Sequence, residues 1–302
     1  MHRLPATMWF KGGFEAHSAT EDILACYNGE AAFFRHLAKN LDIGCPRSFA
    51  TVMNEDTGRS CILLEDLLLQ NATFGHASKP LSPDQAARVL SFHAKLHGRY
   101  WERTVELDQY DWLKGGGALL GGGVTAKQFE PENWNICMAL PRAEFITGPL
   151  RDRERVGKLM LHMLRTDTEK AQCLAHGDPH LGNTFMLPEG RVGYLDWQTV
   201  MLGYWAFDVG YFMTTAMTVA DRRHAERDLI AHYCKELAAL GVSLPFDLAW
   251  LQYRRHSLYN LAWGAGTPGW QPEDVYCINT ERAYTAALDL DMLGAWEEPW
   301  VA

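Results

Sequence analysis

The sequence of 302 residues has no excess of positive charge and no paired cysteines. Lys and Arg total 28 against 37 Asp and Glu, a net charge of −9 at pH 7. This balance argues against a nucleic-acid partner, because proteins that bind the phosphate backbone rely on clustered positive charge. The seven cysteines are scattered and form no C-x-x-C pair. This pattern argues against a disulfide framework or a zinc site and favours a reducing compartment.

Long apolar runs are also absent. The longest, Cys61–Leu69, contains Glu65 and Asp66 and is far shorter than the roughly 20 residues that span a bilayer. The first residues lack the apolar stretch of a secretory signal. We therefore expect a cytoplasmic protein with no membrane partner. The sequence gives no indication of the oligomeric state.

The first third of the chain has mixed α and β patterning. A short strand is predicted within residues 5–14 and a helix over 21–40, where apolar residues recur at three- and four-residue steps. Two strands, Ser48–Met53 and Ser60–Leu64, flank a turn at 54–58. This mixed region is expected to end near Leu67.

The rest of the chain is predicted to be mainly helical. Ser82, Pro83 and Gln85 form a capping-box signature at the start of one helix. Further helices are predicted over 151–170, 219–240, 246–265 and 279–292, and the glycine-rich segment 115–123 is predicted to be a loop. The chemically informative stretch lies between Cys173 and Asp208.

Within that stretch, two short apolar runs, 184–187 and 191–195, flank the turn sequence Pro188-Glu189-Gly190. A hairpin folded about Glu189 places Asn183 opposite Leu195, with Asp196 one residue further on. Asp178 precedes Asn183 by five residues. Two carboxylates and an amide are oxygen ligands of the kind that Mg²⁺ prefers. Taken singly, the same residues are also common in turns and caps.

The motifs resemble those of a known family. His176-Gly177-Asp178-Pro179-His180-Leu181-Gly182-Asn183 has the Asp-to-Asn spacing of a kinase catalytic loop, and Leu195-Asp196-Trp197 stands where protein kinases carry Asp-Phe-Gly. Together they resemble the aminoglycoside phosphotransferase and choline kinase superfamily, and within it the ecdysteroid-kinase-like group. Four more stretches agree with that group: Trp9–Lys11, Tyr27–Phe34, Leu63–Leu67 and Leu96–Trp101.

The resemblance implies an α+β, bilobal, protein-kinase-like fold. A small mixed N-lobe that binds nucleotide would span residues 1–67, and a large, mainly helical C-lobe with the catalytic loop and acceptor-binding helices would span 68–302. In the family, a Gly-rich loop and two strands precede the strand lysine. Only ten residues stand before Lys11. We therefore expect a shortened N-lobe without the strands of that loop.

The resemblance also implies how ATP is bound. Lys11 would contact the α- and β-phosphates, and Glu30 on the following helix would hold that lysine through an ion pair. Backbone groups of Glu65, Asp66 and Leu67 would bind the adenine between the lobes.

For the reaction, the resemblance implies transfer of the γ-phosphoryl group of ATP to a hydroxyl of a small molecule. Asp178 would accept or orient the acceptor hydroxyl, and Asn183 and Asp196 would hold Mg²⁺. Asp208 would support the catalytic loop. A loose transition state needs positioning and charge neutralisation more than a strong base, so an ordinary aspartate suffices.

Two alternatives have different chemistry. The first is a non-catalytic kinase-like binding protein that keeps the fold without turnover. The second is a metal-dependent hydrolase that uses His176, Asp178 and His180. His93 and His97 stand four apart, as zinc-protease ligands do, but Ala94 replaces the glutamate of H-E-x-x-H. These two histidines are therefore expected in a core or on a surface.

Overall fold

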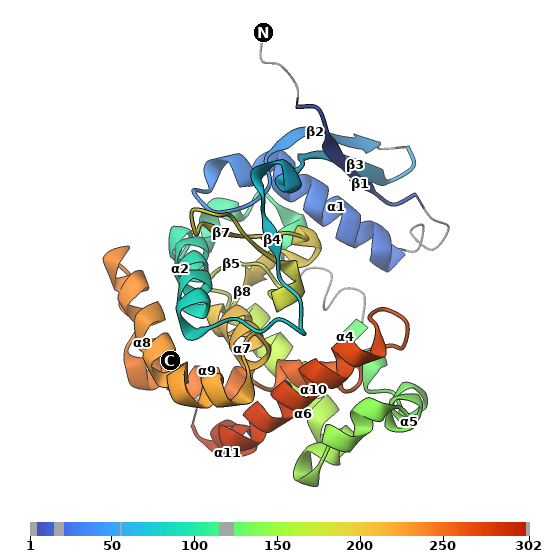
Figure 1. Ribbon diagram of the computed structural model, residues 1–302, viewed down its shortest axis with the longest axis vertical. Helices are drawn as coiled ribbons and strands as arrows, with labels where there is room; N and C mark the ends of the chain where they lie inside the picture. Colours follow the sequence, from blue (N-terminus) through green and yellow to red (C-terminus); the bar gives the residue numbers. More distant parts are fainter. Residues whose placement is uncertain (1–4, 15–20, 55, 115–123, 300–302) are drawn as a thin grey trace.

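The computed structural model describes residues 5–14, 21–54, 56–114 and 124–299, and places them in a small and a large part (Figure 1). The small part holds a three-stranded antiparallel sheet of order β1-β3-β2 and one long helix beneath it. Its elements are β1 (Met8–Gly12), α1 (Glu21–His36), η2 (Ala38–Asn40), β2 (Ser48–Asn54) and β3 (Arg59–Glu65).

The sheet packs on α1 through alternating residues of its central strand. Ile62 and Leu64 of β3 are buried, as strand periodicity of two requires when one face meets a core. From α1, the buried apolar residues include Ala31, Ala32, Phe33 and Phe34. Lys11 of β1 lies opposite Ile62 in the register. The sheet therefore carries the predicted lysine over the helix that carries Glu30.

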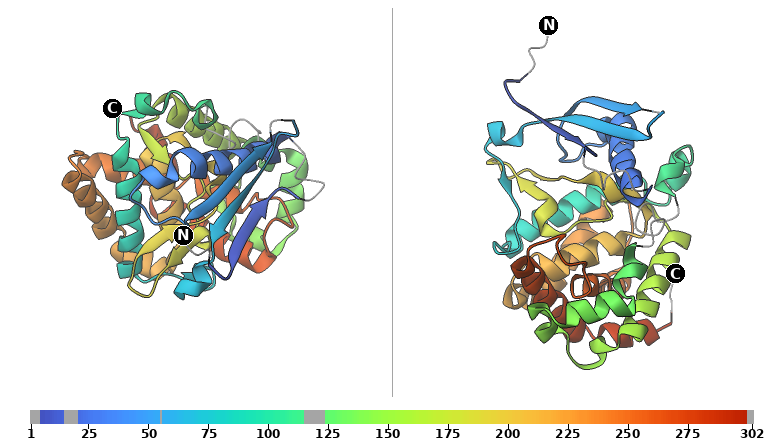
Figure 2. Two further views of the ribbon diagram at one scale, coloured as in Figure 1. Left: turned by 90° about the horizontal axis from the view of Figure 1, so that it is seen from above. Right: turned by 90° about the vertical axis from the view of Figure 1, so that its right-hand side faces the viewer.

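The large part is mainly helical, with short strands at its junction with the small part (Figure 2). Its helices are α2 (Pro83–Arg99), α4 (Val124–Gln128), α5 (Pro131–Met138), α6 (Arg153–Glu169), α7 (Trp205–Thr215), α8 (Val219–Ala239), α9 (Phe246–His256), α10 (Glu273–Asp289) and α11 (Met292–Glu297). Its strands are β4 (Thr73–Phe74), β5 (Cys173–Ala175), β6 (Thr184–Met186), β7 (Val192–Tyr194) and β8 (Met201–Gly203). Short 3₁₀ helices link them: η3 (Leu67–Gln70), η4 (Thr104–Leu107), η5 (Asp111–Leu113), η6 (Pro141–Phe145), η7 (Gly148–Arg151), η8 (Leu181–Asn183), η9 (Trp197–Thr199) and η10 (Tyr259–Trp263).

Helix α7 runs through the centre of the large part. Every one of its residues from Trp205 to Thr215 is buried. A helix surrounded on all sides has no polar face, so it lacks the amphipathic pattern that reveals a surface helix in a sequence. That is why the sequence did not predict α7, although it carries Asp208.

The helices and strands that were predicted agree with the structure except at some helix ends, whereas α4, α5, α7, β5 and β8 were not predicted. The Ser82 capping box forms with both of its hydrogen bonds. The helix predicted over 246–265 is wrong in its second half, because α9 ends at His256 and η10 follows. At that point Gly210 of α7 lies so close to His256 that a Cβ would sit 2.8 Å from it. The helix predicted over 279–292 begins earlier, at Glu273, after Pro272.

The loop predicted over 115–123 lies outside the described residues. The boundary predicted between residues 67 and 68 falls inside η3. All seven cysteines are free thiols. Within the described ranges, no helix has the length and apolar character that crossing a bilayer requires.

Candidate active site

The β6–β7 hairpin brings the predicted site residues to one end. Its register pairs Thr184 with Tyr194, Phe185 with Gly193 and Met186 with Val192, as predicted for a turn about Glu189. The N–H of Leu195 donates to the carbonyl of Asn183 over 2.7 Å. Asn183 and Asp196 therefore leave the hairpin side by side. Strand β4 adds a third strand to this sheet through pairing with β6.

The segment before the hairpin is held from below by Asp208. The carboxylate of Asp208 accepts the N–H groups of His176 (2.7 Å) and Gly177 (3.0 Å) and lies 3.1 Å from Nε2 of His97. All of these groups are buried. Burial alone would raise the pKa of Asp208, but the hydrogen bond and charge of His97 outweigh it and lower the pKa to about 2. Asp208 is therefore an ionised anchor, as expected.

The ring of His176 joins the segment that holds Asp178 to the segment that holds Asp196. Its Nδ1 accepts the N–H of Asp178 (3.2 Å), and its Nε2 lies 2.9 Å from the carbonyl of Leu195. Burial lowers the pKa of His176, so the ring is neutral near pH 7 and donates from Nε2. Both nitrogens are thus occupied within the chain. His176 is then not a metal ligand, which removes the basis of the hydrolase alternative.

The other histidine pair is also structural. His93 and His97 are fully buried, and His97 lies 2.8 Å from the hydroxyl of Tyr233 as well as near Asp208. Over the described part of the chain, no group of three His, Cys, Asp or Glu side chains could hold a metal. His93 and His97, expected in a core or on a surface, lie in the core.

Asp178 and Asn183 lie in direct contact. Nδ2 of Asn183 donates to the backbone carbonyl of Asp178 (2.9 Å) and to its Oδ2 (3.2 Å). The side chain of Asp178 is one-third exposed, and Nε2 of His180 lies 3.6 Å from Oδ2. Asn183 uses its amide nitrogen for these bonds, which leaves its amide oxygen unengaged with Asp178. Tyr211 also hydrogen-bonds the side chain of Asp178, which still keeps one-third of its surface exposed.

Lys11, Glu30 and Asp196 form a second group. Nζ of Lys11 lies 2.7 Å from Oε2 of Glu30 and 2.7 Å from Oδ1 of Asp196. Burial lowers the pKa of Lys11, but the two carboxylates outweigh burial and raise it above its usual value. Burial raises the pKa of Glu30, whereas the charge of Lys11 outweighs burial at Asp196 and lowers the pKa there. One ammonium therefore serves two carboxylates, and the group carries excess negative charge.

The backbone at Asp196 fixes this group to α1. Asp196 adopts a left-handed conformation (φ 58°, ψ 65°), which Asp tolerates better than most residues. The next N–H, of Trp197, donates to Oε1 of Glu30 over 3.2 Å. The indole of Trp197 stacks on Phe33 of α1 with ring centroids 4.1 Å apart. The small and large parts are thus joined at the site itself.

The predicted adenine-binding segment lies apart from these groups and is partly used by the fold. The N–H of Glu65 donates to Arg47, and its carboxylate accepts the N–H of Arg47 (2.7 Å) and Nε2 of Gln70 (2.7 Å). The carboxylate of Asp66 caps η3 at Leu68 and accepts from Thr7 and Trp9. The hydrogen bond from Thr7 leads the contacts that lower the pKa of Asp66. The side chain of Leu67 is buried.

Aromatic side chains surround Asp178 on the helical side. The ring of Trp263 lies 5.7 Å from that of His180 in an edge-to-face arrangement. Burial, followed by the negative charge of Asp178, raises the pKa of Tyr211 and Tyr259 well above the usual range. Both phenols are therefore protonated near neutral pH.

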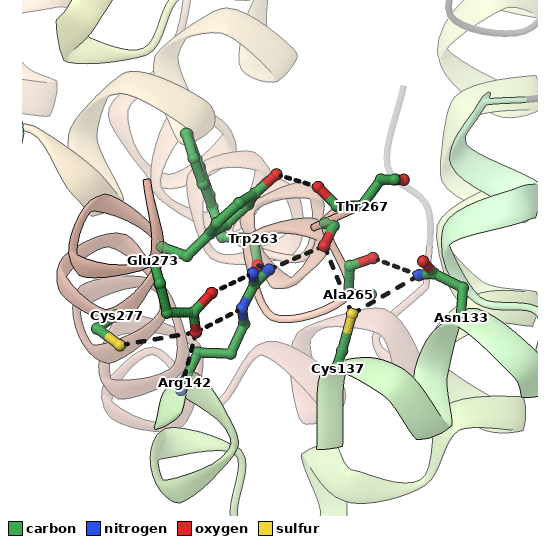
Figure 3. A network of polar contacts seen from close by, with 10 residues as sticks. Asn133, Cys137, Arg142, Trp263, Ala265, Thr267, Glu273 and Cys277 are labelled. Carbon is green, nitrogen blue, oxygen red and sulfur yellow. Dashed lines mark hydrogen bonds and ion pairs between the residues drawn. The ribbon is translucent and has the colours of Figure 1, made fainter. Parts of the chain in front are cut away.

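A buried arginine holds Trp263 in place (Figure 3). Arg142 of η6 is fully buried and forms a two-pronged ion pair with Glu273 at the start of α10. Its Nη1 donates to the carbonyls of Trp263 (3.3 Å) and Gly266 (2.8 Å), and its guanidinium lies 3.5 Å above the ring of Tyr276. The loop after η10 is thereby fixed to α10. We call these residues the Arg142 network.

Sequence reasoning missed several residues of this site. Gln198 hydrogen-bonds Asp196, Tyr211 lies near Asp178, and Arg142 supports Trp263. Gln198 follows the Asp196 motif by two residues and could have been suspected from that position. Tyr211 lies in a uniformly buried helix and Arg142 in a 3₁₀ turn, and neither gives a sequence signal. The roles predicted for the other site residues stay predictions.

Comparison with known proteins identifies the family. A solved structure of a microcompartment-associated aminopropanol kinase is 15% identical, covers 96% of this chain and 86% of its own, and superposes with a TM-score of 0.51. Choline kinase LicA from Streptococcus pneumoniae (14% identity, 93% and 85% coverage, TM-score 0.49) and Plasmodium vivax ethanolamine kinase (14% identity, 91% and 75% coverage, TM-score 0.49) are also similar. At 15% identity the likeness to the aminopropanol kinase structure shows the fold, and it confirms the predicted α+β, protein-kinase-like class with a small N-lobe and a helical C-lobe.

At the level of sequence, no curated protein matches the chain. The narrower ecdysteroid-kinase-like assignment stays a prediction. The family model described as "Phosphotransferase enzyme family" matches residues 25–242, which include Glu30, Asp178, Asn183 and Asp196. Since the match extends over more than two-thirds of the sequence, this chain belongs to the phosphotransferase enzyme family.

Proposed function

We propose that this chain transfers the γ-phosphoryl group of ATP to a hydroxyl group of a small molecule, with Mg²⁺ as the metal. The observation that carries the proposal is that two groups of polar side chains are connected through one histidine ring. Lys11, Glu30 and Asp196 form one group, and Asp178 with Asn183 forms the other. The ring of His176 links the two groups through its bonds at Asp178 and Leu195.

Lys11 is suited to bind phosphate. Its ammonium is oriented by Glu30, which is itself held by the N–H of Trp197. Because the nearby carboxylates raise the pKa of Lys11, the side chain stays charged at every physiological pH. Lys11 would contact the α- and β-phosphates, and backbone groups around Asp66 and Leu67 would bind the adenine. Glu65 contributes less to adenine binding, since the sheet uses its N–H.

The donor set at the junction of the two groups fits Mg²⁺. Asp196 and Asn183 supply a carboxylate and an amide oxygen, which are the hard ligands that this ion takes. Lys11 occupies Oδ1 of Asp196, and the group of Lys11, Glu30 and Asp196 carries an excess negative charge that a divalent ion would offset. Asn183 and Asp196 would hold the ion. When bound, Mg²⁺ neutralises charge on the β- and γ-phosphates.

Asp178 is suited to orient the acceptor. The backbone N–H of Asp178 donates to Nδ1 of His176, which fixes the position of the residue. Its carboxylate is accessible and accepts a hydrogen bond from Nδ2 of Asn183. It would accept the hydrogen bond of the acceptor hydroxyl and take its proton as the phosphoryl group transfers. Trp263, Tyr211 and Tyr259 would exclude water from that side. A small acceptor fits this arrangement better than a protein, because no A-P-E segment follows Asp196.

The direct test measures ADP release with a panel of hydroxylated metabolites as acceptors. Asp178→Asn keeps the size of the side chain and its contact with Asn183 but removes the charge. We expect turnover to fall roughly 10²- to 10⁴-fold, as for loss of a positioned general base, with nucleotide affinity nearly unchanged. Asp228→Asn on the exposed face of α8 serves as the matched control and should keep full activity. Full turnover in Asp178→Asn would refute the assigned role.

A second variant tests the metal. Asp196→Asn should abolish most Mg²⁺-dependent nucleotide binding, because Asn suits the left-handed backbone yet lacks the charge. Binding is read as a thermal shift with Mg-ATP, which stabilises by RT ln(1 + [L]/Kd). If the wild-type chain binds Mg-ATP but turns over no acceptor, the non-catalytic alternative is favoured. If Mg-ATP gives no shift at all, the ATP-dependent proposal is wrong.

A further inference from the structure

The small lobe holds a cavity that the proposed reaction does not use. It has a volume of about 510 Å³ and lies between the C-terminal end of α1, the connection that follows, and the first half of β2. None of the predicted site residues lines it. Cavities of about 300–1,000 Å³ are the size that binds small molecules. The volume is therefore sufficient for a ligand of moderate size.

The charged side chains that line the cavity are all basic. They are Arg35 at the end of α1, Lys39 one helical turn further on, and Arg47 before β2. Within the described ranges, none of the three forms an ion pair with a carboxylate. Arg47 instead lies over the ring of Phe49, 5.0 Å from its centroid. In a chain whose net charge is −9, three unpaired cations around one cavity form a distinct local feature.

The pKa of a neighbouring histidine is affected by two of these cations. His36 lies between Arg35 and Lys39 in the sequence. Burial, followed by the charges of Arg35 and Lys39, lowers the pKa of His36. The carboxylate of Glu65, which is close to Arg47, is already engaged by the N–H of Arg47 and by Gln70. Glu65 keeps its negative charge, which after burial helps to raise the pKa of the lining Cys45 thiol, so three cations stand against one neighbouring carboxylate on that side of the cavity.

Part of the lining, which we call the floor, is apolar, although the accessible lining as a whole is more polar than apolar. Its residues Phe34, Ala38 and Leu41 are buried, and Ile43 and Phe49 are partly exposed. A ligand that covers the exposed parts of Ile43 and Phe49 gains roughly 25 cal/mol per Å² of apolar surface removed from water. Apolar side chains and exposed cations thus line the same cavity. A simple inorganic anion would satisfy only the cations, and a neutral apolar molecule would satisfy only the floor.

The geometry points to a binding site for an amphipathic organic anion, in which Arg35, Lys39 and Arg47 bind a phosphate, sulfate or carboxylate head and the apolar floor receives the body. The concave shape suits a single molecule. A bilayer surface would meet the three cations but could not fill the cavity. The site is separate from Lys11, so its occupant is distinct from the nucleotide of the proposed reaction.

Three probes with the same apolar body separate the two contributions. Binding of octyl phosphate, octyl glucoside and octyltrimethylammonium, each below its micelle concentration, is measured by titration calorimetry. We expect octyl phosphate to bind at least about ten-fold more tightly than the other two. Each of Arg35→Ala, Lys39→Ala and Arg47→Ala should weaken it roughly two- to five-fold, as expected for exposed charge pairs, and the triple variant should lose it.

Controls locate the site and distinguish other sources of signal. Arg59→Ala, an exposed arginine at the far end of β3, and Lys11→Ala in the catalytic cleft should both bind octyl phosphate as the wild type does. The proposal is overturned if the three headgroups bind alike, if the triple variant binds as the wild type, or if Lys11→Ala alone abolishes binding. Binding to vesicles of phosphatidic acid without binding to monomeric octyl phosphate would likewise overturn it in favour of a membrane surface.

Discussion

Two ion-pair networks of this protein differ in how their charges are balanced. In the Arg142 network, one guanidinium meets one carboxylate, Glu273, and its remaining donors are taken by backbone carbonyls. At Lys11, one ammonium meets two carboxylates, and both Lys11 and Asp196 remain about one-third exposed. The first network is neutral, with a fully buried guanidinium and a Glu273 side chain that is about one-third exposed, whereas the second has excess negative charge.

The difference separates a structural role from a binding role. The neutral Arg142–Glu273 pair has no net charge to attract a further ion. It fixes the loop that holds Trp263. Two carboxylates that share one cation keep a net negative charge, which a bound divalent ion would offset. Local charge balance therefore distinguishes the two networks although both are built from a base and an acid.

The largest expected effect comes from removing one carboxylate from each network. Glu273→Gln should lower the free energy of unfolding by about 3 kcal/mol, because it leaves Arg142 buried without a counter-ion. Glu30→Gln should cost about 1 kcal/mol, since Lys11 keeps Asp196. Urea denaturation measures both. Glu154→Gln, from an exposed pair on α6, is the control and should change stability by less than about 0.5 kcal/mol. Equal losses at Glu273 and Glu30 would contradict the comparison.

A pH titration extends the comparison to a third polar cluster, around Asp208. Burial lowers the pKa of His93 there to about 3. His93 is therefore protonated below about pH 6.5 in the unfolded chain but only below about pH 3 in the folded chain. The free energy of unfolding consequently falls as the pH drops through this window. At about 1.4 kcal/mol per pH unit, His93 alone costs about 2 kcal/mol between pH 7 and pH 5. His176, whose pKa is also lowered by burial, acts in the same direction.

The variant His93→Leu measures how much His93 contributes to the difference in unfolding free energy between pH 7 and pH 5. Asp208 contributes nothing to the change between pH 7 and pH 5, because its pKa of about 2 lies well below that range. Unfolding free energies at both pH values should therefore differ less in His93→Leu than in the wild type. His224→Gln, an exposed histidine on α8, should leave the difference unchanged. An unaltered pH dependence in His93→Leu would show that another group titrates.

The smallest expected effect is that of Mg²⁺ alone. If the ion binds with a Kd of about 2 mM, then 10 mM MgCl₂ should stabilise the wild type by about 1 kcal/mol. Asp196→Asn should lose this gain, whereas Glu273→Gln should keep it despite its lower starting stability. Thermal unfolding with and without MgCl₂ measures both. A gain that persists in Asp196→Asn would place the ion elsewhere.

The hairpin and its motif were predictable because their determinants are local. The turn at Pro188-Glu189-Gly190 and the apolar runs beside it fix the register, so Asn183 and Asp196 could be placed together from the sequence. The Ser82 helix start was predictable for the same reason. The pairing of Lys11 with Glu30 followed from family resemblance, and the structure brings the two into contact.

What the sequence did not predict depends on contacts between distant segments. Arg142 lies 131 residues from Glu273, and no pattern near either residue announces their pairing. Helix α7 is buried on every side and lacks periodicity. The end of α9 at His256 lies where Gly210 of another helix packs closely against it, a contact that the local sequence does not reveal. Such features follow from packing in three dimensions, which local propensity does not encode.

The left-handed backbone at Asp196 restricts what this position can accommodate. Most side chains with a Cβ pay a conformational cost there, and β-branched residues pay the most. A saturation library at residue 196 should therefore return Asn and Gly as the replacements that express best, whatever their effect on the metal. Folding alone thus restricts this position, whatever the chemistry requires, so residue 196 should tolerate fewer substitutions than Asp178, which has no such backbone demand.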